Sequence, residues 1–191
     1  MMKILLTLFV LLFSSSVLAE DISDFQIEGM SVGDSLLDYF SLNEIHNNIV
    51  KNHYKSIEMQ KVTFSKFDFF NTYEIIEVNY KSNDKNYIIQ SINGILLYEK
   101  DQLSECIKLI QKVSSNDVIG NKKYTFSETT RSHSADPSGE SISHTKYLQL
   151  DNGDVVYQCI DWSDKMDYID HLKVALNSSY FVYWLHNKEY K

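Results

Sequence analysis

Hydrophobic and polar residues alternate with a period of two along much of the chain, which is typical of β-strands that bury one face. This pattern, together with β-branched and aromatic residues, predicts strands at 62–69, 73–81, 87–92, 123–129, 145–150 and 154–160, and another at 172–176. Residues 95–98 either continue the third strand or pair with it. Asp151-Asn152-Gly153 predicts a tight hairpin, because Asn and Gly accept the positive φ that such turns need.

Helical spacing of apolar residues appears in three places. Two short helices are predicted between residues 34 and 50, where Asp34 or Ser35 can cap the first and Ser41 with Glu44 forms a capping box for the second. A longer helix is predicted after Asp101, and a last short one runs from a serine cap at Ser178 or Ser179 through residue 184. The buried side of the longer helix consists of Leu103, Cys106, Ile107, Ile110 and Val113.

These elements predict an α+β fold, in which helices pack on one face of an antiparallel β-sheet. Residues 20–191 contain no internal repeat and no linker, so they are expected to form a single globular domain. Residues 1–19 are predicted to be a secretory signal peptide, with Lys3 in a basic start, an apolar run at 4–13 and Ala19 before the cleavage point. The apolar run is too short to cross a bilayer, which needs roughly 20 residues.

Cys106 and Cys159 are the two cysteines of the chain. An exported protein meets an oxidising compartment, so we expect them to form a disulfide, with two buried thiols as the alternative. Their wide separation is unlike a C-x-x-C redox site, and the bond is therefore expected to be structural.

Composition narrows the classes of partner. The chain has 18 Lys and Arg against 26 Asp and Glu, a net charge of -8, so the cationic surface that attracts nucleic acid or anionic lipid is lacking. Nucleic acid is therefore not expected as a partner. With 43% hydrophobic residues, the chain can build an ordinary core.

The mature start DISDFQIEGMSVGDSLLDYFS, at residues 21–41, resembles that of a group of exported bacterial proteins of unknown function. The segments YIIQSING at 87–94 and DHLKVAL at 170–176 are similar as well. The resemblance implies a periplasmic or extracellular location and carries no site residues. More loosely, Gly29-Met30-Ser31 before two helices and three strands looks like the ααβββ unit of small outer-membrane assembly lipoproteins and β-lactamase-inhibitor-like modules. That likeness implies binding to another protein.

Gly29-Met30-Ser31-Val32-Gly33 also matches G-x-S-x-G, the pattern of the serine nucleophile in α/β-hydrolases. In that fold several strands precede the serine, whereas few mature residues precede it here. The alternative is that both glycines shape a loop before a capped helix.

A polar stretch at 129–144 is too long for a tight hairpin and is predicted to be a functional loop. It carries the candidate ligand or partner residues Arg131, His133, Asp136, Glu140 and His144. His133, Asp136 and His144 have ligand types suited to zinc, but their spacing matches no established metal signature, and a solvated loop with a turn at 136–139 is the alternative.

The sequence thus predicts an exported, non-enzymatic protein that binds another protein or a small ligand, through an exposed sheet face or through the polar stretch. No cofactor or metal is assigned. The alternative is a periplasmic hydrolase, either serine-dependent through Ser31 or metal-dependent through His133, Asp136 and His144.

Overall fold

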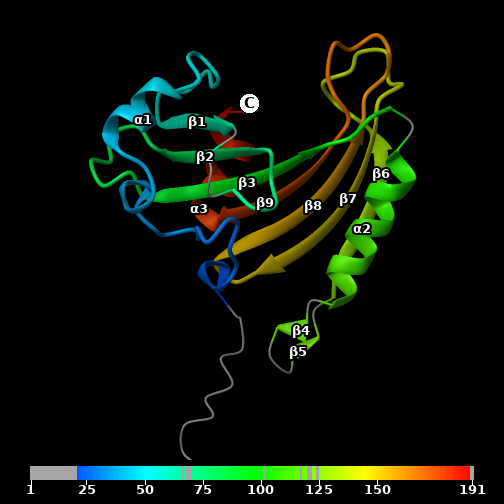
Figure 1. Cartoon of the computed structure of the whole chain (residues 1–191), viewed down its shortest axis with the longest axis horizontal. Helices are drawn as coiled ribbons and strands as arrows, with labels where there is room; N and C mark the ends of the chain where they lie inside the picture. The colour runs from blue at the N-terminus through cyan, green and yellow to red at the C-terminus, as the bar shows by residue number, and fades with distance from the viewer. Residues whose placement is uncertain are drawn as a thin grey trace, which may run out of the picture.

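The computed structural model describes residues 21–65, 67, 70–100, 102–116, 118–119, 122–123 and 125–189. Within this part of the chain, seven strands form one antiparallel sheet in the order β1-β2-β3-β9-β8-β7-β6 (Figure 1). The strands of this sheet are β1 (Met59–Ser65), β2 (Ile75–Lys81), β3 (Ile89–Leu97), β6 (Ser127–Ser132), β7 (Ile142–Leu150), β8 (Gly153–Asp161) and β9 (His171–Ser178). The predicted signal peptide lies outside the described residues.

The sheet consists of two meanders joined by the last strand. Strands β1 to β3 form one meander and β6 to β8 form the other, and β9 pairs with β3 on one side and β8 on the other. Between the meanders lie α2 (Leu103–Asn116) and a separate two-residue pair, β4 (Val118–Ile119) with β5 (Lys122–Lys123). Since β9 closes the centre of the sheet, its side chains lie near those of both meanders.

Apolar side chains on one face of the sheet form the main core. Val62, Phe64, Ile76, Val78 and Ile92 are fully buried there. Burying a side chain of this size contributes about 1.5–3 kcal/mol each. We call this side of the sheet the core face.

The N-terminal segment covers part of the core face: its first turn contacts β8 and β9, and its later part contacts β1 and β3. It contains η1 (Ile22–Asp24), η2 (Leu36–Asp38) and α1 (Leu42–Asn47). The two predicted caps are confirmed: Ser35 accepts from the amide of Leu37, and Ser41 and Glu44 form the capping box. Their short polar side chains hold amides that the first helical turn leaves without a partner.

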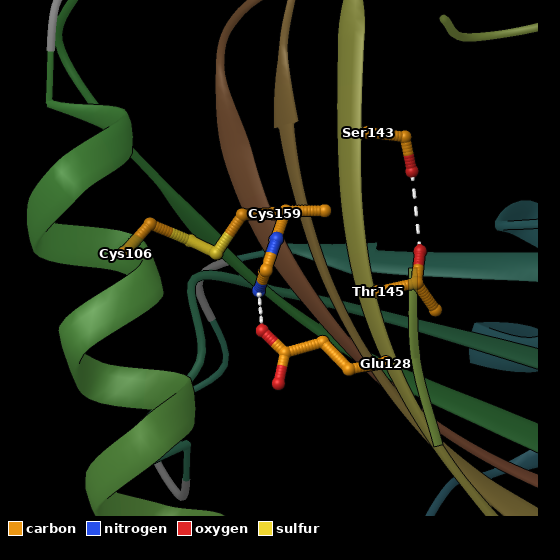
Figure 2. Close-up of a disulfide and its surroundings, with 6 residues drawn as sticks. Cys106, Glu128, Ser143, Thr145 and Cys159 are labelled. Carbon is orange, nitrogen blue, oxygen red and sulfur yellow. Dashed lines mark hydrogen bonds and ion pairs between the residues drawn. A yellow bond between two sulfur atoms is a disulfide. The ribbon is translucent and has the colours of Figure 1, made fainter. Parts of the chain in front are cut away.

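Helix α2 covers the other end of the core face, and a disulfide joins it to the sheet. Cys106 on α2 and Cys159 on β8 are bonded, with their Cα atoms 6.0 Å apart (Figure 2). Cys106 and Ile110 on α2 are buried in the main core. The predicted disulfide is therefore confirmed.

The C-terminal segment forms a second, smaller cluster on the opposite face of the sheet. Helix α3 (Ser179–Trp184) continues into the π-helical turn η3 (Leu185–Glu189), and Ser178 caps α3 as predicted. Phe181 and Trp184 pack here against Met59 of β1. Trp184 is fully buried, so this cluster anchors the C-terminal segment against the sheet.

The predicted α+β class with an antiparallel sheet is confirmed, and so is the hairpin at 151–153, where Leu150 pairs with Gly153. Residues 89–97 form one continuous strand. The strand predicted at 123–129 is wrong in position, because β6 begins at Ser127 and is fixed by pairing with β7 rather than by hydrophobic alternation. All six residues of β6 are exposed.

The polar stretch 129–144, predicted to be a loop, is largely a β-hairpin. Its two ends belong to β6 and β7, and only residues 133–141 connect them. The strands extend this far because Ser132 pairs with Ile142. Among the described residues, none of the helices has the length and apolar character needed to cross a membrane.

Candidate functional site

The sheet face opposite the core face carries mostly polar side chains. Successive side chains of a strand point to opposite faces of the sheet. With the observed strand pairing, the odd-numbered residues of β1, β2, β9 and β7 lie on this face, and so do the even-numbered residues of β8. We call it the polar face, and its polar members include Lys61, Glu77, Asn79, Asn93, Lys173, Asn177, Asp154, Gln158, Ser143 and Thr145. Figure 2 shows Ser143 and Thr145 projecting from the side of β7 that faces away from the disulfide and Glu128.

A pocket of about 300 Å³ lies on the polar face, and we call it the sheet pocket. Its floor comes from β1, β2, β3, β9, β8 and β7. One wall is formed by α3 and η3, through Phe181, Val182 and Leu185, and another by His53 and Tyr54. The sheet pocket therefore combines a polar floor with a partly apolar wall.

An ion pair occupies one side of the floor. Lys61 Nζ lies 2.5 Å from Glu77 Oε1, and both side chains are mostly buried. Asn93 donates a hydrogen bond of 3.2 Å to the other oxygen of Glu77. These contacts neutralise Lys61 and Glu77 within the pocket floor.

Lys173 lies on the floor, on β9, the strand that joins the two meanders. It is half-buried, and its ammonium makes no hydrogen bond or ion pair with any residue in the described part of the chain. Burial lowers the pKa of Lys173, and the positive charge of Lys61 adds to this, while Glu77 opposes it. A cation without a partner in a partly buried position is unfavourable for folding, because its lost hydration is not replaced.

A buried carboxylate occupies the end of the floor near α3. Asp154 is 3% exposed, and burial raises its pKa. Its oxygens accept hydrogen bonds from Asn177 Nδ2 at 2.7 Å and from the Tyr147 hydroxyl at 3.0 Å. Burial near this carboxylate raises the pKa of Tyr147 to about 12, so the phenol stays protonated and keeps donating.

The wall formed by His53 and Tyr54 is fixed from two sides. The Tyr54 hydroxyl donates to Asn79 Oδ1 on the floor at 2.8 Å. Next along the chain, the amides of Lys55 and Ser56 donate to the two carboxylate oxygens of Glu189, at 2.9 and 3.1 Å. Glu189 itself is buried, so η3 holds this wall in place against the sheet.

The candidate residues of the polar stretch are divided between the two faces of the sheet. Arg131 pairs with Ser143 and so lies on the polar-face side of β6, whereas His144 lies on the core face. His144 Nδ1 is 2.7 Å from Thr130 Oγ1, and its Nε2 lies at ion-pair distance, 2.9 Å, from Glu128 without the alignment of a hydrogen bond.

Asp136 organises the connection between β6 and β7. It is 5% exposed, and its carboxylate accepts hydrogen bonds from Ser138, Ser141 and Ser163. The hydrogen bonds from Ser141 and Ser138 hold its pKa far below the usual range. Glu140 is exposed and pairs with Lys165. Asp136 therefore has a structural environment, and its oxygens are already occupied.

His133 packs against Trp162, with ring centroids 4.4 Å apart and the ring planes tilted by 59°. Burial lowers its pKa, and the charges of Lys173, His171 and Arg131 act in the same direction. His133 thus belongs to the surroundings of the polar face. His133, Asp136 and His144 do not converge: no group of three His, Cys, Asp or Glu side chains suited to a metal ion occurs in the part of the chain described.

Ser31 does not have the surroundings of a serine nucleophile. It is 4% exposed, and within the described residues no histidine forms a hydrogen bond with its hydroxyl. Gly29 and Gly33 have φ values of +80° and +98°, which favour glycine. The G-x-S-x-G pattern is therefore explained by two left-handed turns that lead into η2.

Sequence reasoning missed the sheet pocket because its residues come from six strands. A local signal was nevertheless present: polar residues recur every second position within strands that are otherwise apolar, as in Lys61 and Thr63, Glu77 and Asn79, and His171 and Lys173. In an antiparallel sheet such a face can be solvent-exposed, so this signal alone does not distinguish a pocket from a wetted surface.

Comparison with known proteins adds no relative, because no protein-family model, no curated protein and no solved structure matches this chain.

Proposed function

We propose that this protein binds a small polar organic molecule in the sheet pocket and does so without catalysing a reaction. The observation that carries the proposal is Lys173, a half-buried ammonium on the pocket floor that has no hydrogen-bond or ion-pair partner among the described residues. A desolvated ammonium without a hydrogen-bond partner lowers stability, and such costs are typical of residues kept for function.

The dimensions of the pocket favour a small molecule over a macromolecule. A volume of about 300 Å³ is at the lower end of the range for small-molecule sites. Ligand sites of this kind combine apolar walls with a few fixed polar groups. Here Phe181 and Leu185 supply the wall, and Lys173, Asn93 and Asn177 supply the polar groups.

The proposal predicts that the purified protein retains a small molecule from a cell extract. The purified protein is incubated with the small-molecule extract of its own cells, separated by gel filtration, denatured and analysed by mass spectrometry. Ala175→Phe, which places a ring on the buried pocket floor, should abolish retention. Thr129→Phe on exposed β6 is the matched control and should retain the same compound as the parent.

Two results would contradict the proposal. One is that no compound is retained by the parent protein at near-equimolar amounts. The other is that folded Ala175→Phe, with a cooperative melt, retains the compound as well as the parent does.

We further propose that binding takes place outside the cytoplasm. The buried disulfide between Cys106 and Cys159 supports this, since such bonds persist in oxidising compartments. If the proposed signal peptide is removed, N-terminal sequencing of the protein from cells should begin at Glu20. A sequence that begins at Met1 would contradict export by this route.

A further inference from the structure

The ligand class can be inferred from Lys173, the charge in the sheet pocket that has no hydrogen-bond or ion-pair partner within the described part of the chain. Lys61 and Glu77 neutralise each other at 2.5 Å, and Asp154 accepts from Asn177 and Tyr147. The carboxylates of the described residues all lie more than 4.0 Å from the ammonium of Lys173. The pocket therefore has room for one more negative charge, beside Lys173.

Asp154 does not supply that charge, because it lies at the other end of the floor. Lys173 pairs with Gln158 on β8, and Asp154 is four residues from Gln158 along the same strand. At about 3.4 Å per residue, the two backbone positions are roughly 13 Å apart. The two charges thus mark opposite ends of the pocket.

The backbone around Lys173 favours a carboxylate over a phosphate group. Phosphate sites usually use free backbone N–H groups from glycine-rich loops or helix N-termini. Lys173 lies inside β9, which is paired on both sides, with β3 and with β8, so the surrounding amides belong to the sheet ladder. A single ammonium with side-chain amides matches a monoanion.

An apolar strip lies next to this position. Val156 and Ala175 are directly paired, and this pair lies two residues, about 7 Å along the strands, from the pair formed by Gln158 and Lys173. Phe181 and Leu185 line the wall of the same pocket. A ligand anchored at Lys173 would therefore place an apolar body over Val156 and Ala175.

Resting on the function proposed above, we propose that the ligand of the sheet pocket is a monocarboxylic acid with an apolar body, whose carboxylate pairs with the ammonium of Lys173. The carboxylate replaces the hydration that Lys173 loses on folding. The apolar body is buried between the strip formed by Val156 and Ala175 and the wall formed by α3 and η3.

Three probes that share one alkyl chain test this inference: octanoate, octanamide and octyl phosphate. Calorimetric titration of the full mature protein should give a dissociation constant for octanoate at least about tenfold lower than for the other two, as expected for one charge-assisted contact. Lys173→Met should remove this preference. Lys165→Met, at an exposed lysine far from the pocket lining, is the matched control and should keep it.

The inference is overturned if octanoate and octanamide bind equally, if octyl phosphate binds best, if no probe binds, or if Lys173→Met keeps the preference. These failures leave the proposed function standing as long as the metabolite experiment finds a compound that depends on the pocket. If that compound lacks a carboxylate, the ligand class is wrong and the binding function is correct. If Ala175→Phe retains the compound, the binding function itself is wrong.

Discussion

Lys173 is a side chain whose placement makes folding less favourable. Burial lowers its pKa from the ordinary value of 10.5, which means that the folded protein resists the charged form. Between the lowered folded pKa and 10.5, the unfolded chain binds more protons than the folded one, so stability rises with pH in that window. A residue needed only for packing would be expected to have an apolar side chain here.

We therefore expect Lys173→Met to stabilise the protein, while it removes the preference for octanoate. Methionine keeps the length of the side chain and removes the desolvated charge. A gain of about 1 kcal/mol would raise the melting temperature by about 2–4 °C for a protein of this size. Differential scanning calorimetry near neutral pH measures the change, with Lys165→Met as the control at an exposed site. A lower melting temperature for Lys173→Met would show that the ammonium contributes to stability.

Individual residues differ in how far the sequence reveals their roles. Two pairs could be assigned from the sequence. The spacing of Ser41 and Glu44 is that of a capping box, and Cys106 and Cys159 are the two cysteines of a chain that was predicted to be exported. Asp136 was predicted to be a candidate ligand or partner residue. Its carboxylate instead organises a turn, and one of its hydrogen bonds comes from Ser163, which is distant in sequence and could not be foreseen. Lys173 follows the alternation of polar and apolar residues that a solvent-exposed strand would also show, so its role depends on a pocket that forms only when distant strands pair.

At the scale of elements, η3 connects the end of the chain to the wall of the sheet pocket. Glu189 accepts from the amides of Lys55 and Ser56, next to His53 and Tyr54. π-Helical turns are often found at functional sites, because they redirect side chains within a helical segment. In this protein the turn brings Leu185 and His186 into the pocket lining.

Glu189→Ala should loosen this wall without unfolding the sheet. The amides of Lys55 and Ser56 would lose their acceptors, and we expect them to exchange with deuterium about tenfold faster or more. Hydrogen exchange followed by mass spectrometry measures the change in peptides that cover residues 50–58, with peptides from β8 as the internal reference. Ser127→Ala, on exposed β6, is a control that should leave both regions unchanged. Unchanged exchange at Lys55 and Ser56 in Glu189→Ala would contradict a role for η3 in holding the wall.

Elements defined by neighbouring residues could be predicted, whereas those defined by distant pairing could not. The hairpin at 151–153 and the cap at Ser178 depend on a few adjacent residues, and both were predicted correctly. The position of β6 depends on its pairing with β7, and its exposed polar sequence has no hydrophobic alternation to reveal it. The insertion of β9 between β3 and β8 is a non-local arrangement of the same kind.

At the scale of the whole molecule, the described part of the polar face carries Lys61, Lys173 and Arg131 against Glu77 and Asp154, a slight positive excess on a chain whose net charge is -8. His133 lies close to three other basic side chains on this face. The charges of Lys173, His171 and Arg131 all lower its pKa. The sequence gives the total charge but not this distribution, which arises only when β6, β8 and β9 come together. A local excess of positive charge attracts anionic ligands even to an acidic protein.

This distribution predicts a loss of stability in mildly acidic solution. Burial lowers the pKa of His133 and of His171, which are half-buried, from 6.5, and neighbouring cations contribute. As the pH falls through 6.5 and then toward the lowered folded pKa values, the unfolded chain binds protons before the folded protein does, so folding becomes less favourable. The carboxyls of Asp136 and Glu28 behave differently: hydrogen bonds lower their pKa values, so their stabilising effect is present above about pH 4 and is lost only below it.

We expect the free energy of unfolding to fall by about 1 kcal/mol between about pH 7.5 and pH 5.5. The change is this small because both imidazole rings are partly exposed, so that solvent screens their charges. A second and steeper loss should follow below about pH 4, when Asp136 and Glu28 are protonated. Urea unfolding at a series of pH values measures both stages. His171→Gln, whose amide can still donate toward the carbonyl of Ile169, should flatten the first stage and leave the second unchanged. A free energy of unfolding that stays constant down to about pH 5.5 in the parent protein would contradict the assigned environment of the two histidines.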